Sequence, residues 1–88
     1  MAFAVNDIQS TPNPNALKFV LNRSIAEHPC SFFNAEAASS HPIASRLFGV
    51  AGVASLLLLG DFVTVNKEPK VSWKAITPKV REILQTSG

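Results

Sequence analysis

The sequence predicts an α+β domain in which one mainly antiparallel, four-stranded sheet carries two helices on one face, in the order strand, strand, helix, strand, strand, helix. Three observations predict it. Two apolar β-type runs meet at Gly60-Asp61, two alternating runs lie near the N-terminus, and the C-terminal stretch has helical spacing. With 88 residues, 47% of them apolar and 16% charged, the chain is expected to form a single domain over residues 1–88.

The stretch 47–67 reads as a β-hairpin. Gly60-Asp61 suits a two-residue hairpin loop because glycine adopts positive φ without steric cost. The preceding run, 53–59, is apolar on both faces, so we expect an interior strand covered on both sides. The following run, 62–66, alternates and should pair with it. A buried helix is the alternative, and the two glycines in this stretch disfavour it.

The N-terminal half supplies two further strands. Residues 3–9 and 16–21 alternate, and the segment TPNPN at 11–15 should reverse the chain between them, because its two prolines forbid regular pairing. Periodicity then fades from 22 to 40. We expect a long connection there, with one helical turn capped by Asn34.

Two helices complete the prediction. The His-Pro pair at 41–42 should open a short helix, with Gly49 as a left-handed stop. Ser72 should cap the last helix, whose apolar residues recur at helical spacing. Pro78 inside that helix leaves two alternatives: a kink at Thr77, or Thr77 as the true cap.

Charge and cysteine content restrict the function. Eight Lys and Arg against six Asp and Glu give a net charge of +2, and their scatter along the chain is not a nucleic-acid signature. One cysteine, Cys30, excludes an internal disulfide and every multi-cysteine pattern that holds zinc or an iron–sulfur cluster within one chain. The N-terminus lacks a secretion or import pattern and no apolar run is long enough to span a bilayer. We therefore expect a cytoplasmic location, no membrane and no nucleic acid.

Candidate chemistry gathers around Cys30. With His28 it could form a nucleophile and base, but no third group completes the constellation, so a partly buried thiol in a loop is favoured and no enzyme activity is expected. His28 and His41 could instead join Cys30 and Glu27 or Glu36 as metal ligands. Their spacing fits no ligand pattern, so solvated histidines are favoured and no metal residue is assigned.

The Pro-Asn turn is a candidate binding element. Asn13 and Asn15 offer amides and Lys18 offers a charge, which could contact a partner or an anion. A structural turn whose Asn side chains bond their own backbone is favoured.

A second candidate surface lies near the last helix. Trp73, the only tryptophan, is expected in the core rather than at a contact. Lys67, Lys70 and Lys74 would form a small basic rim suited to an acidic partner or a phosphate.

Five blocks together resemble the N-terminal domain of the Nfu/NifU-type iron–sulfur scaffold proteins: TPNPNALKF at 11–19, PIASRLF at 42–48, GV at 52–53, GDFVTVNK at 60–67 and W-x4-P-x-V-x2-I at 73–83. The resemblance implies the same α+β fold and a non-enzymatic module attached to cluster assembly. In that family a Cys-x-x-Cys pair in a separate C-terminal domain holds the cluster, and residues 1–88 contain no such pair. It therefore implies no cofactor bound by this chain alone, with an iron–sulfur cluster reached only through a partner. His41 stands where the family tends to have serine, and Leu59 where glycine is common.

The leading hypothesis is an accessory interaction module that docks onto proteins of iron–sulfur assembly or onto recipient proteins. The candidate contacts are Asn13, Asn15, Lys18, Arg46, Lys70 and Lys74. The alternative is a domain that binds a small anion or a phosphopeptide through its Lys and Arg side chains. The partner and the oligomeric state are left open.

Overall fold

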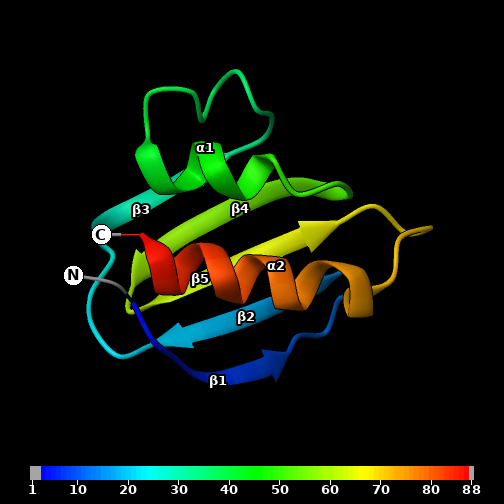
Figure 1. Cartoon of the computed structure of the whole chain (residues 1–88), viewed down its shortest axis with the longest axis horizontal. Coiled ribbons are helices and arrows are strands. Elements are labelled where there is room, and N and C mark those ends of the chain that lie inside the picture. Colours follow the sequence, from blue (N-terminus) through cyan, green and yellow to red (C-terminus); the bar gives the residue numbers. More distant parts are fainter. Residues whose placement is uncertain (1–2, 88) are drawn as a thin grey trace.

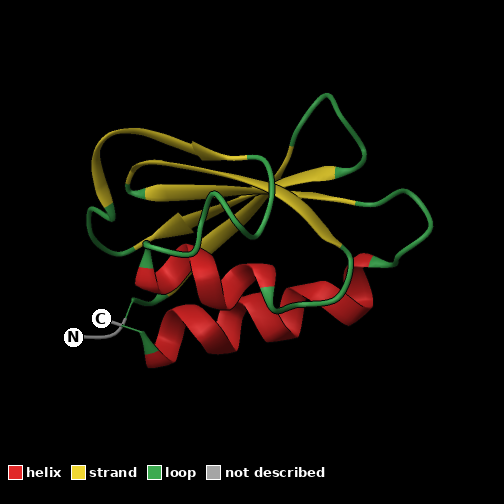
Figure 2. Ribbon diagram, turned by 90° about the horizontal axis from the view of Figure 1, so that it is seen from above, coloured by secondary structure: helices red, strands yellow, loops and turns green. Residues whose placement is uncertain are grey.

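A computed structural model describes residues 3–87 and confirms the α+β class. Its elements, in chain order, are β1 (Val5–Ser10), β2 (Ala16–Leu21), β3 (Ala26–Phe32), α1 (Pro42–Phe48), β4 (Val53–Gly60), β5 (Phe62–Lys67) and α2 (Trp73–Thr86). The strands form one antiparallel sheet in the order β1-β2-β5-β4-β3. Both helices lie on the same face of that sheet (Figures 1 and 2).

The predicted four-stranded sheet is wrong by one strand, and the element order is βββαββα rather than ββαββα. The extra strand, β3, lies inside the stretch 22–40 that we expected to be a connection. It is an edge strand that pairs only with β4, and its ladder is interrupted between Ala26 and Cys30. An edge strand tolerates Pro29 and polar side chains, because one side of its backbone faces solvent. These features remove the alternation that would have revealed it.

The central hairpin is confirmed. β4 and β5 join through Gly60-Asp61, with Leu59 opposite Phe62, and Gly60 has φ +57°. Leu59 therefore leaves the two-residue turn intact. β4 lies between β5 and β3, which makes it the interior strand that its apolar sequence predicts.

Only one face of the sheet is covered by helices in the described part of the chain. Leu56 and Leu58 of β4 are buried on that face, whereas Leu57 and Leu59 are half-buried on the other. The expectation that both faces of β4 are covered is thus wrong. Large, fully buried side chains on the helix side come from three strands and both helices: Phe19, Leu58, Val63, Val65, Leu47, Ile76, Val80 and Leu84.

Two side chains shape the segment between β3 and α1. Asn34 Oδ1 accepts a hydrogen bond from the backbone N–H of Ala37 at 2.7 Å, which confirms the capped turn. His41 Nδ1 accepts from the backbone N–H of Ala44 at 3.2 Å. The imidazole therefore caps α1 in place of the serine hydroxyl expected in the family.

The ends of the helices differ from expectation in one case. Gly49 ends α1 with φ −69°, so the predicted left-handed stop is wrong, and the glycine with φ +97° is Gly52. Ser72 caps α2 as predicted, because its Oγ accepts from the backbone N–H of Lys74 at 3.1 Å. α2 runs unbroken through Pro78, which is exposed. The alternative in which Thr77 caps the helix is therefore wrong. Solvent can hydrate the carbonyl that the proline leaves unpaired.

Candidate interaction surface

The Pro-Asn turn uses its amide oxygens inside the fold. Asn13 Oδ1 accepts from the backbone N–H of Asn15 at 2.9 Å, and the Thr11 hydroxyl donates to the carbonyl of Asn13 at 2.9 Å. These bonds are those of a structural turn, the interpretation that the residue types favour. Partner contact through Asn13 and Asn15 stays a prediction.

Lys67 and Trp73 connect the Pro-Asn turn to the start of α2 through hydrogen bonds. Lys67 Nζ donates to Asn15 Oδ1 at 3.1 Å. It also donates to the backbone carbonyls of Glu68 and Pro69 at 3.3 and 3.4 Å, and it lies 5.8 Å from the centre of the Trp73 ring. Trp73 Nε1 donates to the carbonyl of Pro14 at 3.1 Å. Trp73 is half-buried against the core. The Lys67 and Trp73 side chains therefore position the Pro-Asn turn. Of the predicted basic rim, this leaves Lys70 and Lys74 as the exposed residues.

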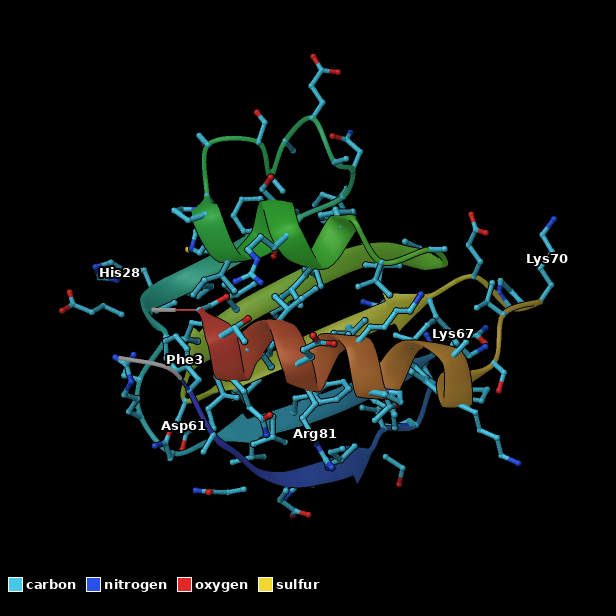
Figure 3. All side chains as sticks on the ribbon, viewed as in Figure 1. Phe3, His28, Asp61, Lys67, Lys70 and Arg81 are labelled. Atoms are coloured by element: carbon cyan, nitrogen blue, oxygen red, sulfur yellow. The ribbon has the colours of Figure 1, made fainter. Side chains whose placement is uncertain are left out.

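Lys70 and Lys74 form that exposed part. Lys70 lies in the turn before α2 and Lys74 in its first helical turn, and both are exposed. Figure 3 shows Lys70 and Lys67 near the beginning of α2, with Asp61 and His28 at the opposite end of the sheet. The described fold thus brings Asn15, Lys67, Lys70 and Lys74 toward one end of the molecule.

Lys18 belongs to a different surface. Its Nζ lies 4.2 Å from the centre of the Phe62 ring, a cation–π contact. Lys18 stands opposite Thr64, which in turn stands opposite Leu57, so all three lie on the face without helices. The sheet separates Lys18 from the other predicted contacts.

Arg46 connects α1 to the end of α2. Its guanidinium donates to Ser87 Oγ at 2.7 Å and to Thr86 Oγ1 at 2.9 Å. Ser87 Oγ in turn donates to the carbonyl of Ile83 at 2.5 Å. The guanidinium is thus held by neutral hydroxyls, and no carboxylate of the described residues pairs with it.

A groove of about 420 Å³ lies beside Arg46, between α1 and α2. Its lining residues are Arg46, Gly49, Val50, Lys79, Glu82 and Ile83. Lys79 is not among the predicted contacts, and it lies 33 positions from Arg46 in the sequence. Helical spacing places Glu82 and Ile83 about one turn after Lys79, but only the packing of α1 on α2 brings Arg46 beside them.

The fold also concentrates positive charge that is scattered in the sequence. Six of the eight Lys and Arg lie in α1, in α2 or in the segment from the end of β5 to α2, and the acidic residues there are Glu68 and Glu82. The other four acidic residues lie in strands and loops elsewhere: Asp7, Glu27, Glu36 and Asp61. The helix side of the molecule is therefore the basic side.

Cys30 lies in a strand and not in the loop that we expected. It is half-buried on β3 opposite the buried Leu58, and its thiol donates to the carbonyl of His28 at 3.4 Å. His41 is engaged at the start of α1. Within residues 3–87, no three His, Cys, Asp or Glu side chains come close enough to hold a metal ion. No described helix is both long and apolar enough to cross a membrane.

Comparison with known proteins decides the family. Residues 5–88 match the family described as "Scaffold protein Nfu/NifU N terminal". The chain belongs to this family. It is 38% identical over 74 residues to the human "NFU1 iron-sulfur cluster scaffold homolog, mitochondrial" and 37% identical over 73 residues to "NifU-like protein 5, mitochondrial" of Arabidopsis thaliana. Each alignment covers 82% of this chain, but only 29% and 26% of those relatives.

Solved structures agree with this membership of the Nfu/NifU N-terminal family. The crystal structure of a Staphylococcus aureus protein superposes with a TM-score of 0.80 at 28% identity, covering 91% of this chain and 96% of the other. A NifU-like protein from Saccharomyces cerevisiae superposes with a TM-score of 0.81 at 27% identity, covering 96% of this chain and 76% of the other. The predicted resemblance is therefore confirmed. Because the human and Arabidopsis relatives are named as mitochondrial, the cytoplasmic location stays a prediction.

Proposed function

We propose that this Nfu/NifU N-terminal domain is a non-enzymatic interaction module of iron–sulfur cluster assembly. It binds assembly proteins or cluster recipients and meets iron only through them. The match over residues 5–88 carries this proposal. Its single cysteine agrees with it, because protein-bound iron–sulfur clusters need several thiolate ligands.

The surface supports a role in binding. Arg46, Lys70 and Lys74 are exposed on the basic side of the molecule. Exposed cations of this kind raise the encounter rate with an acidic partner and restrict which partners fit. Lys18 would contribute only to a partner that reaches the face without helices.

The test is a titration of the ¹⁵N-labelled full chain with purified cluster scaffold and recipient proteins, followed by amide chemical shifts. We expect at least one protein to shift amides around Lys70 and Lys74, and Cys30→Ala to bind equally well. A lack of response to every assembly and recipient protein would count against the proposal.

Anaerobic reconstitution of the chain alone with iron and sulfide provides a second readout. We expect no stable iron–sulfide chromophore after desalting. A chromophore that survives desalting and disappears in Cys30→Ala would contradict the statement that iron is met only through partners.

A further inference from the structure

The groove between α1 and α2 contains a cation, Arg46, that is held in position by hydrogen bonds and pairs with no carboxylate of residues 3–87. Arg46 donates to Ser87 Oγ at 2.7 Å and to Thr86 Oγ1 at 2.9 Å, and both acceptors are neutral. A guanidinium carries five N–H donors, so these two bonds fix the group and leave donors for an incoming acceptor. A fixed, planar donor set of this kind suits a carboxylate, which arginine can bind through two parallel hydrogen bonds.

A second cation lies on the α2 side of the same groove. Lys79 is exposed, and no hydrogen bond or ion pair of its ammonium group is found among the described residues. Of the described residues that line the groove, Glu82 alone carries a carboxylate. The two cations, Arg46 and Lys79, therefore outnumber the one carboxylate in the groove, and this excess of positive charge favours an acidic occupant.

The groove is also apolar, which distinguishes it from a simple anion site. Val50 is buried and Ile83 is half-buried along it, and Gly49 adds no side chain. Its volume of about 420 Å³ falls within the range of about 300 to 1,000 Å³ that is usual for ligand pockets. An occupant that fills it must carry apolar groups beside its negative charge.

We propose that this groove binds an acidic segment of a partner protein. A Glu or Asp carboxylate of that segment lies between Arg46 and Lys79, and a neighbouring apolar side chain packs on Val50 and Ile83. This inference rests on the proposed function, which supplies a protein as the partner. It adds the place of contact and the chemistry that the partner must present.

The first experiment uses a capped ten-residue peptide with four Glu and three Leu, titrated into the ¹⁵N-labelled full chain. We expect the amides of Gly49, Val50 and Ile83 to shift, and the affinity to fall as sodium chloride is added, because exposed charges are screened by salt. The control peptide has Lys in place of every Glu and should leave these amides unchanged. The inference is overturned if the acidic peptide shifts none of these amides, or if it shifts amides on the face without helices instead.

The second experiment removes charge in two matched ways. Arg46→Gln with Lys79→Gln removes two cations from the groove, and Lys74→Gln with Arg81→Gln removes two from the other side of α2. Figure 3 shows Arg81 directed toward β1 and away from α1, and Lys74 lies two helical turns before it on the same side.

We expect the groove pair to weaken peptide binding about fivefold or more and the control pair less than twofold, since an exposed ion pair contributes a factor of about two to five. Equal losses would mean that net charge alone attracts the peptide, which overturns the inference. If Arg46→Gln disturbs the fold, Lys79→Gln alone should still weaken binding about twofold, and it should leave the fold intact because the Lys79 ammonium makes no hydrogen bond or ion pair with a described residue.

Three further outcomes are decisive. If inorganic phosphate shifts the same amides with an affinity equal to that of the peptide, the groove is a small-anion site and the inference fails. If an assembly protein binds the full chain but is unaffected by the Arg46 and Lys79 changes, the inference fails while the proposed function stands. If the acidic peptide binds the groove and no assembly or recipient protein binds at all, the groove stands and the proposed function fails.

Discussion

Gly52→Ala tests whether the backbone at Gly52 holds in place the segment 68–71, which leads into the first turn of α2. Gly52 has φ +97°, and a Cβ built on it would lie 2.7 Å from Val71 Cγ1 and 3.0 Å from both Val71 Cβ and Val71 Cγ2. Its carbonyl accepts from the backbone N–H of Glu68 at 2.8 Å. The segment 68–71, which contains Lys70, is therefore packed directly over a position where no side chain fits.

The cost of the substitution has two parts. A φ of +97° lies beyond the left-handed region that L-residues can enter, which costs about 1–3 kcal/mol. The contact with Val71 adds about 1–3 kcal/mol of overpacking. Together these amount to about 2–6 kcal/mol, against a total stability of roughly 4–13 kcal/mol for 88 residues. At about 4–8 °C per kcal/mol for a domain of this size, the Tm should fall by about 10 °C or more.

Gly60→Ala is the matched control. Gly60 has φ +57° and no atom within 4 Å of a built Cβ, so only the conformational cost of about 1–2 kcal/mol applies. Thermal unfolding followed by circular dichroism measures both variants. A fall in Tm for Gly52→Ala that is no larger than for Gly60→Ala would refute the reasoning.

A double-mutant cycle with Val71→Ala isolates the clash. Removing the Val71 methyl groups should recover part of the loss in Gly52→Ala, so the combined change in the free energy of unfolding should be smaller than the sum of the two single changes. Strict additivity would show that the contact with Val71 contributes nothing.

Three further predictions concern stability. Leu58→Ala should cost about 2–5 kcal/mol because Leu58 is fully buried, whereas Leu57→Ala on the face without helices should cost about 1 kcal/mol; equal midpoints in urea would contradict the assignment of the two faces. His41→Ala should lower the unfolding free energy by about 0.5–2 kcal/mol through loss of the α1 cap, and His41→Ser should restore most of it; equal losses in the two variants would exclude a capping role. Trp73→Phe should cost about 1 kcal/mol or more and speed amide exchange in the β1–β2 turn, because it removes the indole N–H that donates to the carbonyl of Pro14; unchanged exchange would mean that this bond does not hold the turn.

The parts of the fold that follow from local rules were predictable. Gly60-Asp61 gave the central turn because few dipeptides suit a two-residue loop, and Ser72 gave the start of α2 because a hydroxyl there accepts a backbone hydrogen bond. β3 was not predictable in the same way. An edge strand has one partner, tolerates Pro29 and needs no strict alternation, so its sequence resembles that of a loop.

The candidate site depends on contacts that no local pattern encodes. Asn13 and Asn15 could be read as a turn from their types alone, and the structure agrees. The groove could not be predicted, because Arg46 and Lys79 meet only after α1 packs on α2. Single-residue patterns indicate which side chains carry charge, but the sheet and helix packing decide which charges share a surface.

The six predicted contacts cannot act as one interface. α2 is 14 residues long, which separates its two ends by about 20 Å. Lys70 and Lys74 lie at its beginning with the Pro-Asn turn, Arg46 is bonded to its end, and Lys18 is on the opposite face of the sheet. A short segment in the groove therefore contacts Arg46 without reaching Lys70 or Lys18. A large partner that spans the helix side could engage both ends of α2. The affinity for such a partner should then fall in Lys74→Gln as well as in Lys79→Gln. The affinity for the short acidic peptide should fall only in Lys79→Gln.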